Sequence, residues 1–179
     1  MDNAPFSREL EEKKEVEELI RKIARIRSGG QTGADRGALD AALDAEVTIA
    51  GWCPKGGRAE DFEHAPGLLM PYPQLVETPS SGYVQRTAWN VRDSHATLIV
   101  APDGLEPESG TQMTVDFAQD YDRPVLVVAG MEDLAAIREW LATLEEGITL
   151  NVAGPRASKC MRAYDVTFEI IAHLLAFER

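Results

Sequence analysis

A glycine-rich stretch early in the chain has the composition of an anion-binding turn. Residues 28–36 read Ser-Gly-Gly-Gln-Thr-Gly-Ala-Asp-Arg and lie between a short apolar strand pattern and an Ala-rich helical pattern. Glycines let the backbone bend tightly and approach a ligand, and the following helix adds amide N–H groups and the positive end of its dipole. The spacing matches neither the Rossmann nor the P-loop pattern, so no particular cofactor follows. A turn needed only for close helix–strand packing is the alternative.

Two later turns have a similar character and also follow predicted strands. Glu108–Thr111 comes after an apolar run at Thr97–Ala101, and Gly154–Arg156 comes after Ile148–Val152. Parallel strands present their carboxyl ends at one edge of a sheet, where ligands bind. We therefore expect the three turns to converge there. The strand order expected from the chain is 2-1-3-4-5, with the first and third strands as neighbours.

Basic side chains fall in or beside these turns although the chain is acidic. The net charge is −12, and residues 1–27 carry as many Lys and Arg as Asp and Glu, so the deficit lies in residues 28–179. This balance disfavours a nucleic-acid partner, whereas a local basic crevice favours a small phosphorylated ligand. The basic side chains concerned are Arg36, Lys55, Arg58, Arg86 and Arg156.

Along the whole chain, apolar periodicity predicts strands that alternate with helices. This alternation predicts a three-layer α/β/α Rossmann-like fold with a mainly parallel sheet of five or more strands. An amphipathic helix over 7–23 forms an N-terminal helical extension, residues 1–25, before a single domain over 26–179. The expected strands are Ala24–Ser28, Val47–Gly51, Thr97–Ala101, Pro124–Ala129 and Ile148–Val152, and the expected later helices are Ala34–Ala45, Gly82–Ser94, Gln112–Tyr121, Glu132–Glu145 and Cys160–Phe177.

A proline-bearing stretch over Trp52–Ser81 has no sustained period and is too long for an ordinary connection. Such loops are usually functional or disordered. Its charged segment, Cys53–Asp61, is interpreted either as a flap over a ligand or as a solvated surface loop. On the next helix, Tyr83 and Arg86 should face the ligand crevice, while Asn90 either binds ligand or forms a buried structural hydrogen bond.

The remaining chemistry-bearing residues do not predict a metal site. Cys53 and Cys160 are far apart without a C-x-x-C pattern, and the three histidines have no partner at ligand spacing. We expect two unpaired thiols and no metal. No signal peptide or apolar span of membrane length is evident, so a cytoplasmic protein without a membrane partner is expected.

Several motifs in fixed order resemble the molybdenum carrier family, also called molybdopterin cofactor carriers. The resemblance covers about residues 26 to 177 and is specific because the motifs recur in one order. The family looks like a circularly permuted branch of the SLOG, or lysine-decarboxylase-like, Rossmann superfamily. The motifs are Ser28–Arg36, Ala38–Asp40, Gly51–Gly56, Arg58–Asp61, Glu77–Ser80, Tyr83, Arg86–Thr87, Asn90–Ser94, Ala96–Ile99 and Asn151–Pro155.

The resemblance implies a carrier or binding protein for the molybdopterin form of molybdenum or another phosphorylated nucleotide-like ligand. It also implies a homo-oligomer, a dimer or tetramer. In that picture the glycine amides hold phosphate, Lys55 and Arg58 close over it, and Asp35 or Asn90 accepts hydrogen bonds from the ligand. The residues expected to bind are Gly29, Gly30, Gln31, Thr32, Gly33, Asp35, Arg36, Lys55, Arg58, Arg86, Asn90, Ser109, Gly110, Thr111 and Gly154.

A phosphoribohydrolase-like enzyme that cleaves the N-glycosidic bond of a nucleoside monophosphate is the alternative, with a non-catalytic nucleotide sensor as a third. The hydrolase relatives carry a glutamate three residues after a Gly-Thr pair, and Thr114 stands at that position here. Acid–base work on a glycosidic bond needs a positioned carboxyl group. Asp35, Glu60 and Asp116 are the candidates.

Overall fold

The fold is a single parallel sheet between two layers of helices. The computed structural model describes residue 14 and residues 22–176. The helix predicted over 7–23, and with it the helical extension over 1–25, lies almost wholly outside the described residues. The first strand begins at Ile23, so the predicted domain boundary after residue 25 falls inside that strand.

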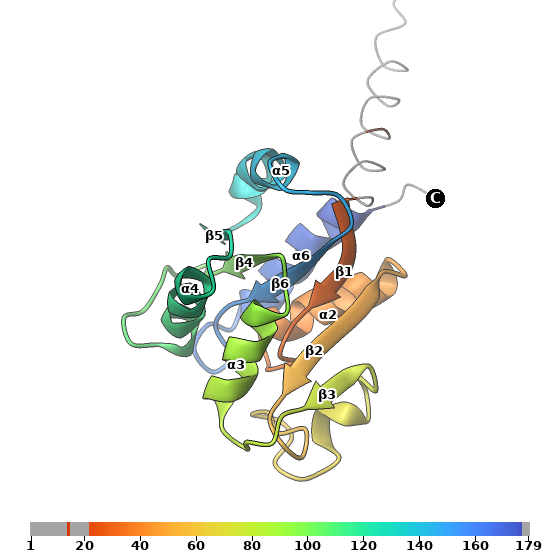
Figure 1. Cartoon of the computed structure of the whole chain (residues 1–179), viewed down its shortest axis with the longest axis vertical. Helices are drawn as coiled ribbons and strands as arrows, with labels where there is room; N and C mark the ends of the chain where they lie inside the picture. Colours follow the sequence, from red (N-terminus) through yellow and green to blue (C-terminus); the bar gives the residue numbers. More distant parts are fainter. Residues whose placement is uncertain (1–13, 15–21, 177–179) are drawn as a thin grey trace, which may run out of the picture.

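Strands and helices alternate along the chain, as predicted. The helices α2 and α6 pack against each other on one face of the sheet, and α3 and α4 pack against each other on the other (Figure 1). The elements are β1 (Ile23–Arg27), α2 (Ala34–Asp44), β2 (Thr48–Cys53), η1 (Gly67–Leu69), β3 (Leu75–Glu77), α3 (Tyr83–Arg92), β4 (Ala96–Val100), α4 (Gly110–Asp120), β5 (Val125–Val128), η2 (Met131–Asp133), α5 (Leu134–Ala142), β6 (Ile148–Ala153) and α6 (Ala163–Leu175).

The strand order is β3-β2-β1-β6-β4-β5, and every described pairing is parallel. The predicted order, with the first strand beside Thr97–Ala101, is wrong because β6 lies between β1 and β4. Burial explains this arrangement: β6 buries most of its residues, whereas β5 exposes Val127 and suits an edge. The chain therefore returns through α5 to place its last strand in the centre.

Buried polar contacts tie the three central strands together. The Ser28 hydroxyl, just after β1, donates to the Val152 carbonyl at 2.7 Å. On the other side of β6, Asn151 donates to the Thr97 hydroxyl at 3.3 Å, and both side chains are buried. These bonds satisfy groups that would be costly to bury alone. They tie β1 to β6 near their carboxyl ends and β6 to β4 near the start of β4.

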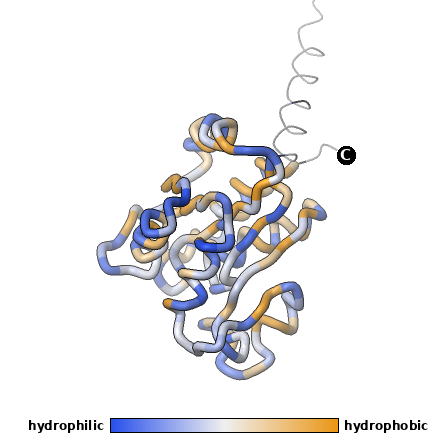
Figure 2. Tube along the Cα trace, in the orientation of Figure 1, coloured by the Kyte–Doolittle hydropathy of each residue, from blue (hydrophilic) through white to orange (hydrophobic). Residues whose placement is uncertain are grey.

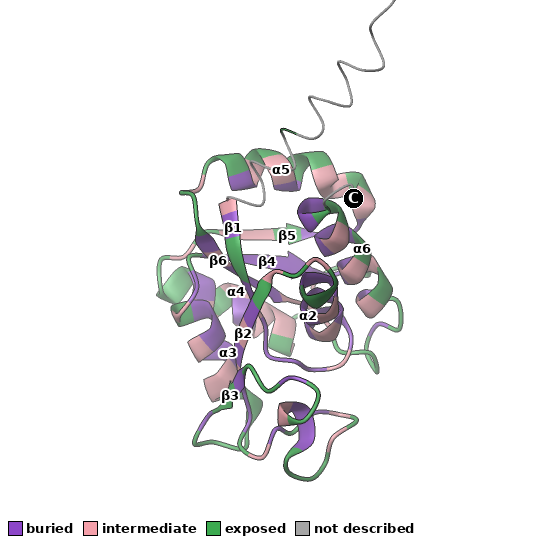
Figure 3. Cartoon of the chain, turned by 90° about the vertical axis from the view of Figure 1, so that its right-hand side faces the viewer, coloured by how far each residue is buried: buried purple, intermediate pink, exposed green. Residues whose placement is uncertain are grey.

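The long stretch over 52–81 is an ordered excursion that contains β3, a strand that was not predicted because it is only three residues long. Figure 2 shows hydrophilic and hydrophobic stretches mixed along it. In Figure 3 most of the excursion is exposed, but the segment around η1 is buried. Tyr72 anchors it by donating to Asp40 of α2 at 2.5 Å. The excursion therefore packs on the domain, beside β2 and α2.

Candidate functional site

A cleft of about 720 Å³ lies at the carboxyl edge of the sheet, where the loops after β1, β4 and β6 meet. Gln31 and Asp35 line it from the first loop, and the start of α3 adds residues between 83 and 87. The other two walls come from residues between 103 and 114 and between 153 and 160. This is the position at which parallel α/β sheets bind ligands, because connections there diverge from neighbouring strands. The three predicted turns do converge on one edge.

The first turn, Gly29–Gly33, is packed against protein. A Cβ on Gly29 would overlap the Arg86 guanidinium, and a Cβ on Gly33 would overlap the Pro155 carbonyl oxygen. Gly33 also has a φ of 81°, which L side chains rarely adopt. These glycines let Arg86 and the loop after β6 approach the turn, and all of them are buried.

Three backbone amides in and just after this turn donate to protein groups. The Gln31 N–H donates to Asp35 Oδ2 at 3.3 Å, and the Thr32 N–H donates to the Gln31 side-chain oxygen at 3.0 Å. The Ala34 N–H donates to the Pro155 carbonyl at 3.2 Å. Of the predicted residues in this turn and at the start of α2, Gln31 and Asp35 line the cleft.

Asp35 and Arg86 form a buried ion pair in the wall of the cleft. Arg86 Nη1 lies 3.1 Å from Asp35 Oδ2, and the two side chains are 14% and 4% exposed. Burial raises the pKa of Asp35 above its ordinary value, although the Arg86 guanidinium acts in the opposite direction. The Arg86 Nε is buried with no hydrogen-bond partner in the described part of the chain. Because such a pair is costly to desolvate, it marks this wall as a functional-site candidate.

The second turn, Ser109–Thr111, is the open one. The Ser109 hydroxyl caps α4 by accepting from the Gln112 N–H at 3.1 Å. A Cβ built on Gly110 would meet nothing within 4 Å, and Gly110 is exposed. Ser109, Gly110 and Thr111 all line the cleft. The positive end of α4 therefore faces the cleft without a covering side chain.

Glu60 joins the excursion to the walls of the cleft without lining it. Its carboxylate accepts from the Thr32 hydroxyl at 2.5 Å and from the Ser158 hydroxyl, and it lies 3.2 Å from Arg156 Nε. Burial raises the pKa of Glu60, but the bonds from Ser158 and Thr32 outweigh it and lower the pKa below its ordinary value. Glu60 is therefore a fixed, ionised tie between three segments.

Other predicted residues lie away from the cleft. Arg36 is paired with Asp61 at 3.0 Å and also donates to the Gly30 carbonyl. Both polar side-chain atoms of Asn90 bond the backbone of Trp52 in β2, at 2.8 Å and 2.9 Å. Lys55 and Arg58 are exposed outside the lining, and Asp116 accepts from Gln112 on the exposed side of α4.

The charge balance of the lining corrects the expectation of a basic crevice. Its cations are Arg86, Arg156 and Lys159, and each is paired with a carboxylate, respectively Asp35, Glu60 and Glu106. Asp103 and Glu108 add further carboxylates to the lining. Arg36, Lys55 and Arg58 lie near these turns in the sequence but do not line the cleft. The cleft therefore offers donors at defined points within an otherwise acidic wall.

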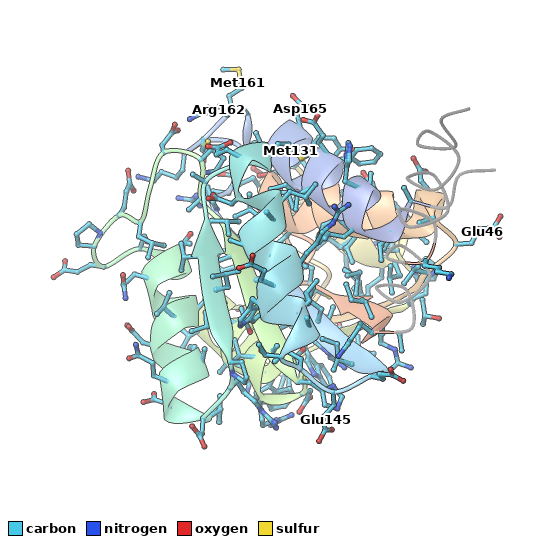
Figure 4. All side chains as sticks on the ribbon, turned by 90° about the horizontal axis from the view of Figure 1, so that it is seen from above. Glu46, Met131, Glu145, Met161, Arg162 and Asp165 are labelled. Atoms are coloured by element: carbon cyan, nitrogen blue, oxygen red, sulfur yellow. The ribbon has the colours of Figure 1, made fainter. Side chains whose placement is uncertain are left out.

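The loop after β6 carries residues that sequence reasoning did not select. Lys159 and the buried Cys160 line the cleft, and burial, with Asp103, raises the pKa of the Cys160 thiol. Arg162 donates to Asp103 at 2.7 Å and points outward beside Met161, which is 89% exposed (Figure 4). The position of this loop in the sequence could have identified these residues, because it follows the last strand and precedes the last helix, where ligand-binding loops occur in such sheets.

Cys53 and Cys160 are unpaired, as predicted, and both are buried. Among residues 14 and 22–176, no group of three His, Cys, Asp or Glu side chains is placed to hold a metal ion. No helix within the same residues has the length and apolar character needed to cross a membrane.

The fold is Rossmann-like, with a cleft at the carboxyl edge of its parallel sheet. Residues 26–175 match the model of a family described as the circularly permutated YpsA SLOG family. The chain therefore belongs to that family, as the resemblance in its motifs implied. A solved structure described as a "putative molybdenum carrier protein" from Syntrophus aciditrophicus SB is 37% identical, with a TM-score of 0.77. The similarity covers 87% of this chain and 97% of that one. No curated protein matches the chain.

Proposed function

We propose that the chain is a carrier-type binding protein for a phosphorylated pterin or nucleotide-like anion, with the molybdenum cofactor as the candidate suggested by the similar structure. The observation that carries this proposal is that one cleft is lined both by the buried Asp35–Arg86 pair and by the open N-terminus of α4. One offers a charged acceptor beside a donor, and the other offers backbone donors. A ligand with a polar ring and a phosphate needs both.

The phosphate is assigned to the second turn. Helix N-termini bind anions through their first amides and the helix dipole, and Gly110 places no side chain over them. Thr111 adds a hydroxyl at the same wall. Arg156 is 45% exposed and lines the facing wall, so its guanidinium can contribute charge to a ligand held there.

The ring of the ligand is assigned to the wall formed by Asp35 and Arg86. Tyr83 and Val84 line the cleft beside this pair and supply apolar surface for a planar group. The Arg86 guanidinium lies 5.8 Å from the centre of the Tyr83 ring. In this proposal the protein contacts the phosphate and the ring of the ligand. A carried metal would be bound by the ligand.

The proposal is tested by identifying what the full chain holds after purification. The protein is denatured, and the released small molecules are analysed by mass spectrometry beside those from a Gly110→Glu variant. We expect a pterin or nucleotide phosphate from the wild type and a marked loss from the variant. Release of no such compound, together with no binding of added pterin phosphate or nucleotide at micromolar concentration, would contradict the proposal.

Hydrolysis of an N-glycosidic bond is the second candidate, and Asp35 is the observation that favours it. A buried carboxyl group with a raised pKa in a cleft is suited to acid–base chemistry. Glu60 is held by three partners, and Asp116 lies outside the lining. Nucleoside monophosphates incubated with the protein would be analysed chromatographically for free base. Base release lost in Asp35→Asn but kept in Asp116→Asn would favour the enzyme over the carrier.

A further inference from the structure

One oxygen of the Asp35 carboxylate has no hydrogen-bond donor in the described structure. Oδ2 accepts from the Gln31 amide and from Arg86, whereas none of the described residues donates to Oδ1. The side chain is only 4% exposed, and the residue lines the cleft. Oδ1 is not among the fully enclosed side-chain atoms that lack a partner, and a carboxylate oxygen can accept two hydrogen bonds, so Oδ1 can accept from a ligand in the cleft.

The surroundings of Oδ1 favour a planar ring over a flexible polar group. Tyr83 presents an aromatic ring at the same wall, and the Arg86 guanidinium lies near it. Gly29 admits the guanidinium so closely that no side chain fits between them. Flat, rigid surfaces of this kind stack on aromatic heterocycles. A donor that reaches Oδ1 from the cleft is therefore best placed on the edge of such a ring.

We propose that Asp35 is the specificity residue of the cleft, and that its Oδ1 accepts from the adjacent ring N–H and exocyclic NH₂ of a 2-amino-4-oxo heterocycle. Guanine and pterin share this edge. The inference rests on the proposed binding of a phosphorylated ring compound at this cleft and adds which ring is selected. Arg86 keeps the carboxylate in place by holding its other oxygen.

The proposal predicts an order of affinity among three nucleotides that carry the same phosphate. GMP offers both donors, IMP offers the ring N–H alone, and AMP presents a ring acceptor towards the carboxylate. A hydrogen bond to a charged group is worth about 1.5–3 kcal/mol, so each lost donor should weaken binding by roughly tenfold or more. A site built to pair with a donor rejects analogues that lack it.

Isothermal titration of the full chain with GMP, IMP and AMP tests the order without any mutation. We expect GMP to bind most tightly and AMP least, and Asp35→Asn to remove the preference. Asp44→Asn on the same helix, at an exposed position outside the cleft, is the matched control and should keep it. Thermal unfolding of both variants establishes that they are folded.

The outcomes separate this inference from the function on which it rests. Equal affinities for the three nucleotides would overturn the role of Asp35 while leaving phosphate binding intact. A much weaker affinity for deoxy-GMP than for GMP would also overturn it, because Asp35 would then be reading ribose hydroxyls. No binding of any nucleotide or of pterin phosphate would contradict both proposals.

Discussion

Two of the glycine-bearing turns at the carboxyl edge of the sheet, Gly29–Gly33 and Ser109–Thr111, differ in what surrounds them. Gly29–Gly33 lies against Arg86 and the loop after β6, and its Gln31 and Thr32 amides bond to protein groups. Ser109–Thr111 opens into the cleft, and space around Gly110 is empty. The more glycine-rich turn thus shapes the wall of the cleft, and the less conspicuous turn offers the exposed helix terminus.

This difference shows that a glycine cluster indicates a close approach to the backbone, but not whether a ligand or another part of the protein makes that approach. In the first turn the approaching groups are a guanidinium and a carbonyl of the same chain. Contact with a ligand and contact with the protein's own groups both need residues without a Cβ, so amino-acid composition does not distinguish the two. The alternative reading of the first turn, close packing, therefore describes its glycines, while Asp35 and Gln31 beside them line the cleft.

Substitution of Gly33 by Val should give the largest effect on stability. The new side chain would overlap the Pro155 carbonyl and require a φ near 81° for a β-branched residue. Backbone strain and overpacking together predict a loss of about 3 kcal/mol or more in the free energy of unfolding. Urea denaturation measures it. Gly110→Ala is the control and should change that free energy by no more than about 0.5 kcal/mol. Equal effects at the two positions would contradict the claim that the first turn is closely packed and the second is open.

Substitution of Gly29 by Ala should have a smaller effect, because the atom it displaces ends a side chain. The added methyl group would push the Arg86 guanidinium away from Asp35. Overpacking predicts a loss of about 1–3 kcal/mol, measured by the same denaturation. In an Arg86→Met background the same Gly29→Ala substitution should cost much less, which would support a steric conflict with Arg86; an undiminished loss in that background would contradict it.

Two carboxylates that hold the first turn should contribute to stability with opposite pH dependence. The pKa of Asp35 is raised by burial in the folded state, so its contribution is present below the ordinary value of 3.8 and is lost as pH rises through the folded value. The pKa of Glu60 is lowered, so its contribution is present above 4.5 and is lost as pH falls. Unfolding of wild type, Asp35→Asn and Glu60→Gln across this range should show differences of opposite slope; parallel slopes would contradict the assignment.

Much of the fold was predictable because its signals are local. The run Ala96–Val100 is buried throughout, as a continuous apolar strand predicts, and Ser109 caps α4 at the expected turn. Strand order was not predictable in the same way, because the central place of β6 depends on which faces the other elements leave uncovered. The three-residue strand β3 was missed because it is shorter than a period can reveal.

The location of the candidate site was predictable from the sequence, but the contacts of its side chains were less so. Strand ends correctly located Asp35, Arg86 and Ser109–Thr111 in one cleft. Arg36 was predicted there but pairs with Asp61, since side-chain direction on the first turn of α2 depends on the excursion packed beside it. Lys159 was not selected because nothing local distinguishes it from a surface lysine.

The most direct test of the account is the affinity of the cleft for a phosphorylated ring when charge is placed on the open turn. GMP and pterin phosphate would be titrated into the wild type, Gly110→Ala and Gly110→Glu. Because Gly110 is exposed and has open space around it, both variants should fold, and a carboxylate at a helix N-terminus is itself favourable. The account predicts near wild-type affinity for the alanine variant and a loss of about tenfold or more for the glutamate variant. Unchanged affinity in Gly110→Glu would contradict it.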